Sequence, residues 1–346
     1  MSKLILAVAL VFALAIPASA VEFTAPQVPE EGAELMPEDT GSFAAGLMEL
    51  LRDAVLGLRP DLKEASKVSL GVIAAVMMVS LLQSFSGNVK TVANLAGATA
   101  IAAGLLLSAN SLIRLGSQTV TEISEYGKLL LPVMTAAMAA QGGAASSTAL
   151  YAGTAMFDSV LSSLISRLLG PMVYLFLALS AANGAIGENI LGKLRDLVKN
   201  VVSWSLKTIL TVFTTYMTVT GVVSGTTDAA ALKATKVTIS SVVPVVGGIL
   251  SDASEAVLVS AGLMKNAAGI YGILAVLAVF LSPFLKIGVH YLILKLTAAV
   301  CGIFGEKGLT ELIGDFSTAM GLLLAMTGSE CLLLLISTVC FLKGVG

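Results

Sequence analysis

Charged residues, histidine and cysteine are scarce in this chain of 346 residues. Only 12% of the residues are charged, about half of the roughly 25% found in soluble domains, whereas 56% are hydrophobic and the mean hydropathy is +0.94. Such a chain cannot cover a surface that faces water, which excludes a soluble globular protein. A formal net charge of −2 provides no basic surface for nucleic acid. We therefore expect the lipid bilayer, and no nucleic acid, as a partner.

Little in the sequence can support metal or cofactor chemistry. Cys301, Cys331 and Cys340 are odd in number and lie in apolar stretches, where a thiol usually packs as a small hydrophobic side chain. A disulfide framework is therefore not expected. The single histidine, His290, lies in an apolar run and has no partner that would complete a catalytic triad. The sequence predicts no catalytic residue, no metal and no cofactor, and hence a protein that is not an enzyme.

One short motif resembles a nucleotide-binding loop. Gly187, Gly192 and Lys193 have the spacing G-x-x-x-x-G-K, but Leu194 stands where such a loop needs a Ser or Thr hydroxyl for magnesium. The preceding segment is a predicted membrane span and not a strand. We interpret the match as a basic loop beside the membrane.

The N-terminus has the features of a signal peptide. Lys3 precedes an apolar run over residues 4–16, and Ala18 and Ala20 fit the small-residue rule of signal peptidase. We predict that residues 1–20 are removed by cleavage after Ala20, the alternative being an uncleaved signal anchor. The mature N-terminus would then lie outside the cytoplasm.

Residues 21–67 form an acidic leader that is interrupted by proline. More than a third of all Lys, Arg, Asp and Glu side chains lie within the first 67 residues. The proline-rich part is too acidic to fold by itself, so we expect a flexible extracytoplasmic segment. From Ser42 onward, apolar residues at helical spacing predict an amphipathic helix that Pro60 ends. This helix either rests on the bilayer or docks a partner outside the cytoplasm.

We interpret residues 68–346 as a polytopic membrane domain. The predicted fold class is all-α, with about seven transmembrane helices plus broken or re-entrant segments. The runs long enough to cross about 30 Å of hydrocarbon are residues 68–83, 92–113, 168–187, 208–223, 267–285, 287–304 and 316–342. Residues 129–165 predict a hairpin that enters the membrane and returns, and residues 237–250 a similar short piece. The residues expected to break helices or to pack them closely are Pro132, Gly142, Gly143, Gly221, Gly225, Pro244, Gly247, Gly248 and Pro283.

Charges predict an orientation for these seven spans. The positions expected inside the cytoplasm are Lys90, residues 188–199, Lys286 and Lys343. The positions expected on the opposite side are the leader, residues 114–128, residues 228–265 and residues 306–315.

Four charged residues interrupt the apolar segments, and Lys207, near the start of its span, is expected to snorkel to the interface. The other three are candidate intramembrane polar groups: Asp158, Lys295 and Glu330. Such groups usually face the interior of a helix bundle or water. Lys295 and Glu330 lie far from the ends of their segments, which leaves open an interior pair or two separate polar contacts.

Two motifs in the C-terminal half resemble a known family. Residues 242–255, VVPVVGGILSDASE, and residues 280–291, FLSPFLKIGVHY, are similar to stage III sporulation protein AE of endospore-forming bacteria. The resemblance implies a multi-pass protein of the mother-cell (outer forespore) membrane. It also implies membership of a channel or feeding complex with a separate secretion-type ATPase, small membrane subunits and ring-forming proteins. The alternative is a secondary transporter or permease for a small solute, a class that also uses broken helices.

Overall fold

The computed structural model describes residues 26–37, 42–84, 89–140, 144–186, 189–219, 267–304 and 307–343. Every regular element in these ranges is a helix, which confirms the all-α class. The elements are α2 (Glu30–Ala33), α3 (Phe43–Gly57), α4 (Arg59–Gln83), α5 (Val89–Ala140), α6 (Ala144–Leu164), the π-helix η1 (Ile165–Leu169), α7 (Gly170–Ile186), α8 (Asn189–Val219), α11 (Ala267–Gly302) and α12 (Lys307–Lys343).

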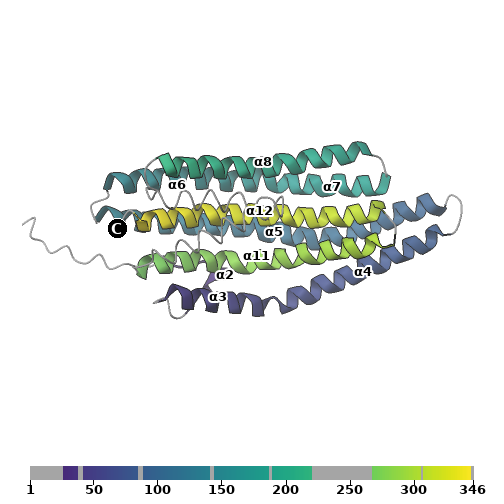
Figure 1. Ribbon diagram of the computed structural model, residues 1–346, viewed down its shortest axis with the longest axis horizontal. Coiled ribbons are helices and arrows are strands. Elements are labelled where there is room, and N and C mark those ends of the chain that lie inside the picture. The colour runs from purple at the N-terminus through teal and green to yellow at the C-terminus, as the bar shows by residue number, and fades with distance from the viewer. Residues whose placement is uncertain are drawn as a thin grey trace, which may run out of the picture.

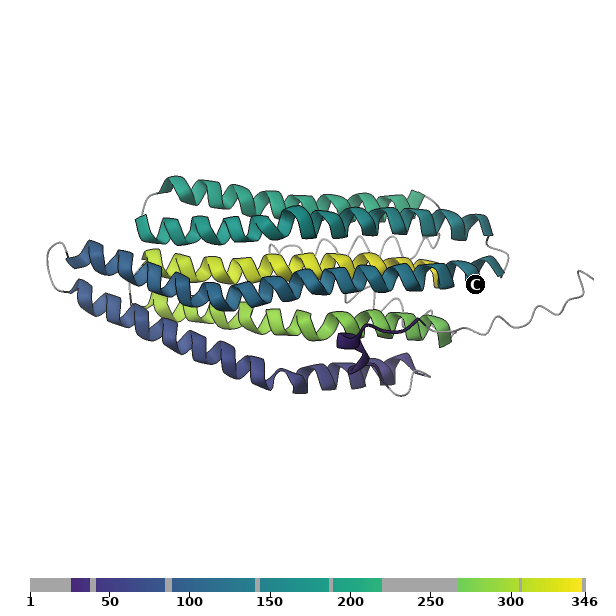
Figure 2. The same ribbon diagram turned by 180° about the vertical axis from the view of Figure 1, so that it is seen from behind.

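The long helices lie side by side in an elongated bundle (Figures 1 and 2). At one end, which we call the turn end, α4 meets α5, α7 meets α8 and α11 meets α12. The opposite end, which we call the terminal end, holds the start of α3, the junction of α5 with α6, the end of α8, the start of α11 and the end of α12. α3 and α4 follow each other in one direction, and so do α6, η1 and α7. Counted as two rods, they alternate in direction with α5, α8 and α12, and α11 runs parallel to them.

The bundle is much longer than the hydrocarbon core of a bilayer. α5 has 52 residues and is about 78 Å long at 1.5 Å per residue, whereas the hydrocarbon is about 30 Å thick. Five helical segments of the described residues are long and apolar enough to cross a membrane, so the predicted count of seven is not confirmed. These segments are Phe43–Gln83, Val92–Ala136, Ser147–Ala185, Gly269–Gly302 and Lys307–Leu342.

The predicted hairpin at residues 129–165 is right in that α5 and α6 pack against each other on either side of residues 141–143, but wrong in that it does not begin as a separate segment at residue 129. α5 continues as one helix through the charged residues 114–128 and through Pro132 to Ala140. Pro132 lacks one backbone hydrogen bond without ending the helix, as does Pro283 within α11. Charges seemed to mark the end of a span because the sequence does not reveal that the helix extends beyond the thickness of a membrane.

The amphipathic helix near the N-terminus forms where the apolar spacing predicts it. α3 ends at Gly57, and Pro60 lies in the first turn of α4, where its missing N–H costs little. The buried face of α3 packs against α11: a Cβ placed on Gly46 would lie 2.8 Å from Leu274 Cδ1. α2 also packs on α11. Part of the acidic leader therefore lies against the helix bundle.

α12 is the central helix of the bundle. It packs against α5, α6, α7, α8 and α11, and almost all of its most apolar stretch is buried. Apart from Glu330 and a few Ser and Thr side chains, this stretch is apolar all round, as expected for a helix enclosed by other helices. A hydrogen bond from Ser317 Oγ to the backbone oxygen of Tyr291, 3.0 Å long, sets the register between α12 and α11.

Candidate functional site

Two carboxyl groups meet in the interior of the bundle. Asp158 lies on α6 and Glu330 on α12, and their exposed fractions are 2% and 0%. The two side chains are close enough to interact directly. Buried acids of the same sign are rare because each loses its hydration, so the pair is the most unusual polar feature among the described residues.

α5 supplies the polar contact of this pair. Ser124 Oγ donates a hydrogen bond of 2.8 Å to Asp158 Oδ2. One turn further along α5, Gly127 allows a close approach, because a Cβ there would lie 3.8 Å from Asp158 Oδ1 and 3.1 Å from Leu334 Cδ1. Asp158 Oδ1 and both carboxyl oxygens of Glu330 have no hydrogen-bond partner within the part of the chain that the structure describes.

A second polar contact fixes the same two helices against each other. Thr154 Oγ1, one turn before Asp158 on α6, donates to Ser337 Oγ of α12 at 3.0 Å. Ser337 Oγ in turn bonds the backbone oxygen of Leu333 at 2.8 Å. The register of α6 on α12 is therefore set by hydroxyl groups beside the carboxyl pair.

Lys295 is not part of this site, so an interior pair of Lys295 and Glu330 does not form. Lys295 is exposed, and its Nζ lies 3.1 Å from Tyr291 Oη and 5.3 Å from the centre of the Tyr291 ring. α11 and α12 are antiparallel, and Ser317 of α12 contacts Tyr291 of α11. The residue of α11 that lies opposite Glu330 is therefore near Ala278. Ala278 precedes Lys295 by 17 positions, which corresponds to about 25 Å along the helix.

The turn end carries an ion pair that the sequence did not predict. Arg195 Nη1 of α8 lies 2.6 Å from Asp315 Oδ2 of α12, and both side chains are largely buried. Arg195 also lies 3.2 Å from Asp196. The pair joins residues 188–199 to residues 306–315, which the orientation model placed on opposite sides. That part of the predicted orientation is wrong, because α11 and α12 return to the end at which α8 begins.

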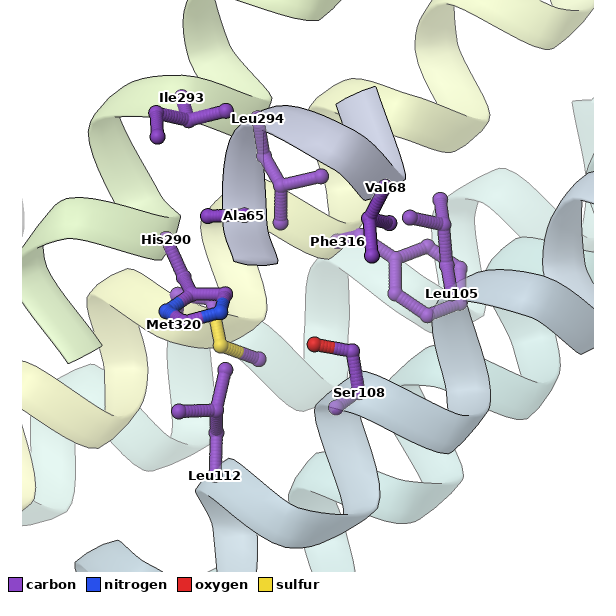
Figure 3. A pocket seen from close by; sticks show the side chains of 11 residues that line it. Ala65, Val68, Leu105, Ser108, Leu112, His290, Ile293, Leu294, Phe316 and Met320 are labelled. Carbon is purple, nitrogen blue, oxygen red and sulfur yellow. The ribbon is translucent and has the colours of Figure 1, made fainter. Parts of the chain in front are cut away.

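The single histidine lines a small crevice between α4, α5, α11 and α12 (Figure 3). The crevice measures about 10 Å³, enough for one water molecule at most, and its lining is apolar apart from Ser108 and His290. His290 Nδ1 lies 2.9 Å from the backbone oxygen of Lys286, one turn earlier on its own helix. This geometry is that of a packed histidine with a local hydrogen bond.

The remaining predicted positions divide into two groups. Cys301, Cys331 and Cys340 are buried free thiols, and Lys193 is exposed at the start of α8. No group of His, Cys, Asp or Glu that could hold a metal ion occurs among the described residues. The predicted positions that lie outside the described residues are Ala18, Ala20, Gly142, Gly143, Gly187, Gly221, Gly225, Pro244, Gly247 and Gly248.

The contact of Ser124 with Asp158 could have been found from the sequence. Both residues lie 17 positions from Gln141, which opens the Gln-Gly-Gly turn. Two helices that fold back at this turn place residues at equal distances from it opposite each other. The pairing with Glu330 carries no such signal, because the two residues are far apart in the chain.

The bundle and its buried polar groups define a polytopic helical membrane protein. The family described as stage III sporulation protein AE matches residues 41–344. The chain therefore belongs to that family and has a role in sporulation. Stage III sporulation protein AE of Bacillus subtilis (strain 168) is 25% identical over 199 residues, which cover 57% of this chain and 50% of the relative. The match thus spans about half the length of the curated relative. No solved structure matches the chain.

Proposed function

We propose that this protein is a non-enzymatic membrane subunit of a complex that links the mother cell to the forespore and sustains the forespore after engulfment. Its place would be the outer forespore membrane, with the mature N-terminus outside the cytoplasm. Its partners would be a separate secretion-type ATPase, small membrane subunits and ring-forming proteins. The observation that carries the proposal is the family match over residues 41–344.

The dimensions of the bundle support this role. A bundle whose longest helix measures about 78 Å extends well beyond a bilayer of about 30 Å, so part of it can reach into the space between two membranes. A subunit that contacts partners across such a space needs a rigid part outside the lipid. The helical rods can supply that part.

A secondary transporter for a small solute is the second candidate. The observation that favours it is the buried pair of Asp158 and Glu330, because transporters hold ionisable groups inside their helix bundles. Purified protein reconstituted alone into vesicles separates the two candidates. Solute-specific flux without any partner would support the transporter and contradict the subunit.

Deletion of the gene in its own host tests the main proposal. We expect engulfment to proceed and forespore development to stop afterwards, with recovery when the wild-type gene is restored. The tagged protein, isolated from sporulating cells with a mild detergent, should carry the ATPase and the other subunits with it. Normal forespores in the deletion strain, or isolation of the protein without these partners, would contradict the proposal.

A further inference from the structure

The carboxyl pair of Asp158 and Glu330 lacks the hydrogen bonds that buried polar groups require. Three of its four carboxyl oxygens have no partner among the described residues, and the fourth, Asp158 Oδ2, accepts from Ser124. An unpaired buried carboxylate is strongly destabilising, and two of them side by side also repel each other. The pair therefore cannot remain doubly ionised in this packed interior.

One proton removes the conflict. If Glu330 carries it, its O–H can donate to Asp158 Oδ1, and Asp158 remains ionised with a donor on each oxygen. A hydrogen bond from a carboxylic acid to a carboxylate is of the strong, charge-assisted kind. We propose that Asp158 and Glu330 form a proton-binding site that holds one proton between α6 and α12 and so fastens these helices together.

The surroundings of the pair favour a proton over a metal ion. Sodium or magnesium ions need about six oxygen ligands, whereas the described residues bring only Ser124 to the two carboxyl groups. The segments of α11 and α8 at this level, residues 275–281 and 208–215, contain no titratable side chain. A proton needs only the two acids themselves.

The charged group that faces the pair comes from α5. Lys128, one turn beyond Ser124, is exposed and acts electrostatically on both carboxyl groups, and Cys331 is the neighbouring buried thiol on α12. Loss of the shared proton leaves two negative charges between α6 and α12. The contact between these helices is therefore sensitive to proton concentration.

Infrared spectroscopy of the full-length protein in lipid nanodiscs tests the site directly. At neutral pH the wild-type protein should show a protonated-carboxyl stretching band that Glu330→Gln lacks. The glutamine amide replaces the O–H donor to Asp158 and keeps the shape of the side chain. Glu311→Gln, at an exposed position of the same helix, is the matched control and should retain the band. A missing band in the wild-type protein, or its persistence in Glu330→Gln, would overturn the proposal.

Thermal unfolding against pH provides a second readout. The folded state holds one proton that the unfolded state releases above the ordinary carboxyl range of about pH 4, so stability must fall as the pH rises. The folding equilibrium constant should drop about tenfold per pH unit until the folded pair loses its proton. Glu330→Gln should flatten this profile, whereas Glu311→Gln should follow the wild type. A flat wild-type profile, or stabilisation by added sodium or magnesium ions in the wild type alone, would count against a proton site.

Discussion

The ion pair at the turn end makes a quantitative prediction about how α8 is held to α12. Arg195 and Asp315 are 2.6 Å apart, and their side chains are only 13% and 14% exposed. Removing one partner of such a pair leaves the other charge buried, which typically costs about 3–5 kcal/mol. We expect Asp315→Asn and Arg195→Met each to lower the free energy of unfolding by about 3 kcal/mol, near the lower limit, because both groups retain some contact with solvent.

A double-mutant cycle measures the interaction itself. Purified protein in mixed micelles is unfolded with dodecyl sulfate, and the free energies of unfolding of the wild type, both single variants and the double variant are compared. The double variant should lose less than the sum of the singles by about 0.5–3 kcal/mol, because no unpaired charge remains. Lys199→Met is the matched control, since Lys199 lies 3.9 Å from the half-exposed Asp196 on its own helix. That contact should be worth at most about 1 kcal/mol.

Two results would refute this reasoning. Additive losses in the double variant would mean that Arg195 and Asp315 stabilise the protein separately and that α8 is not fastened to α12 at this point. A loss in Lys199→Met as large as that in Asp315→Asn would show that burial of the pair is not what gives it its strength.

Three further predictions follow from the packing and the chain direction. Gly153→Ala should lower the free energy of unfolding by about 1–3 kcal/mol, because the new Cβ would overlap the Tyr216 ring. Gly104→Ala is the control: no atom lies within 4 Å of its new Cβ, so this variant should be as stable as the wild type or more stable. Thermal unfolding measures both. A compartment-specific reporter fused after Lys193 or after Lys307 should give the same result at both sites, and opposite results would contradict the bundle. Lys193→Ala should leave sporulation nearly intact, and a severe defect with normal membrane insertion would mean that this loop binds a nucleotide after all.

Helix content was predictable from the sequence, but the boundaries of the membrane spans were not. Apolar spacing located α3, and Pro60 marked the end of that helix. The charged residues 114–128 suggested a loop, yet they continue the helix of α5. Hydropathy indicates whether a residue is suited to lipid or to water. In a bundle longer than the bilayer, one helix can contact lipid along part of its length and water along the rest. Charge therefore ended the predicted span without ending the helix.

The buried acids show a similar limit. Asp158 and Glu330 stand out in the sequence because each interrupts an apolar segment. Opposite charge made Lys295 the natural partner of Glu330, but the packing of α6 on α12 brings two acids together instead. Partner choice depends on the register between helices that are distant in the chain. That register is set here by small contacts, such as Thr154 with Ser337, which carry no recognisable sequence pattern.

The exposed side chains of α4 and α5 indicate which half the bilayer surrounds. Toward the turn end the exposed side chains of α4 and α5 are apolar, with Met78 64% and Leu107 80% exposed, whereas toward the terminal end α5 exposes Arg114, Glu125 and Lys128. Lipid is a favourable environment for the exposed apolar side chains near the turn end, whereas the exposed charged side chains near the terminal end require water. We therefore predict that the turn-end half is embedded and that the terminal-end half projects into water.

Cysteine accessibility tests this placement in a background in which Cys301, Cys331 and Cys340 are replaced by Ala. A membrane-impermeant thiol reagent should label Glu125→Cys on vesicles that are open to it on both sides, but it should not label Leu107→Cys. Both positions are on the surface of the same helix, so a difference between them reports lipid and not protein packing. The two residues are 18 positions apart, about 27 Å along the helix. A bilayer of about 30 Å centred near Ala100 extends to about residue 110, so it covers Leu107 and leaves Arg114 and Glu125 outside. Labelling of Leu107→Cys, or protection of Glu125→Cys until detergent is added, would place the bilayer around the terminal-end half instead.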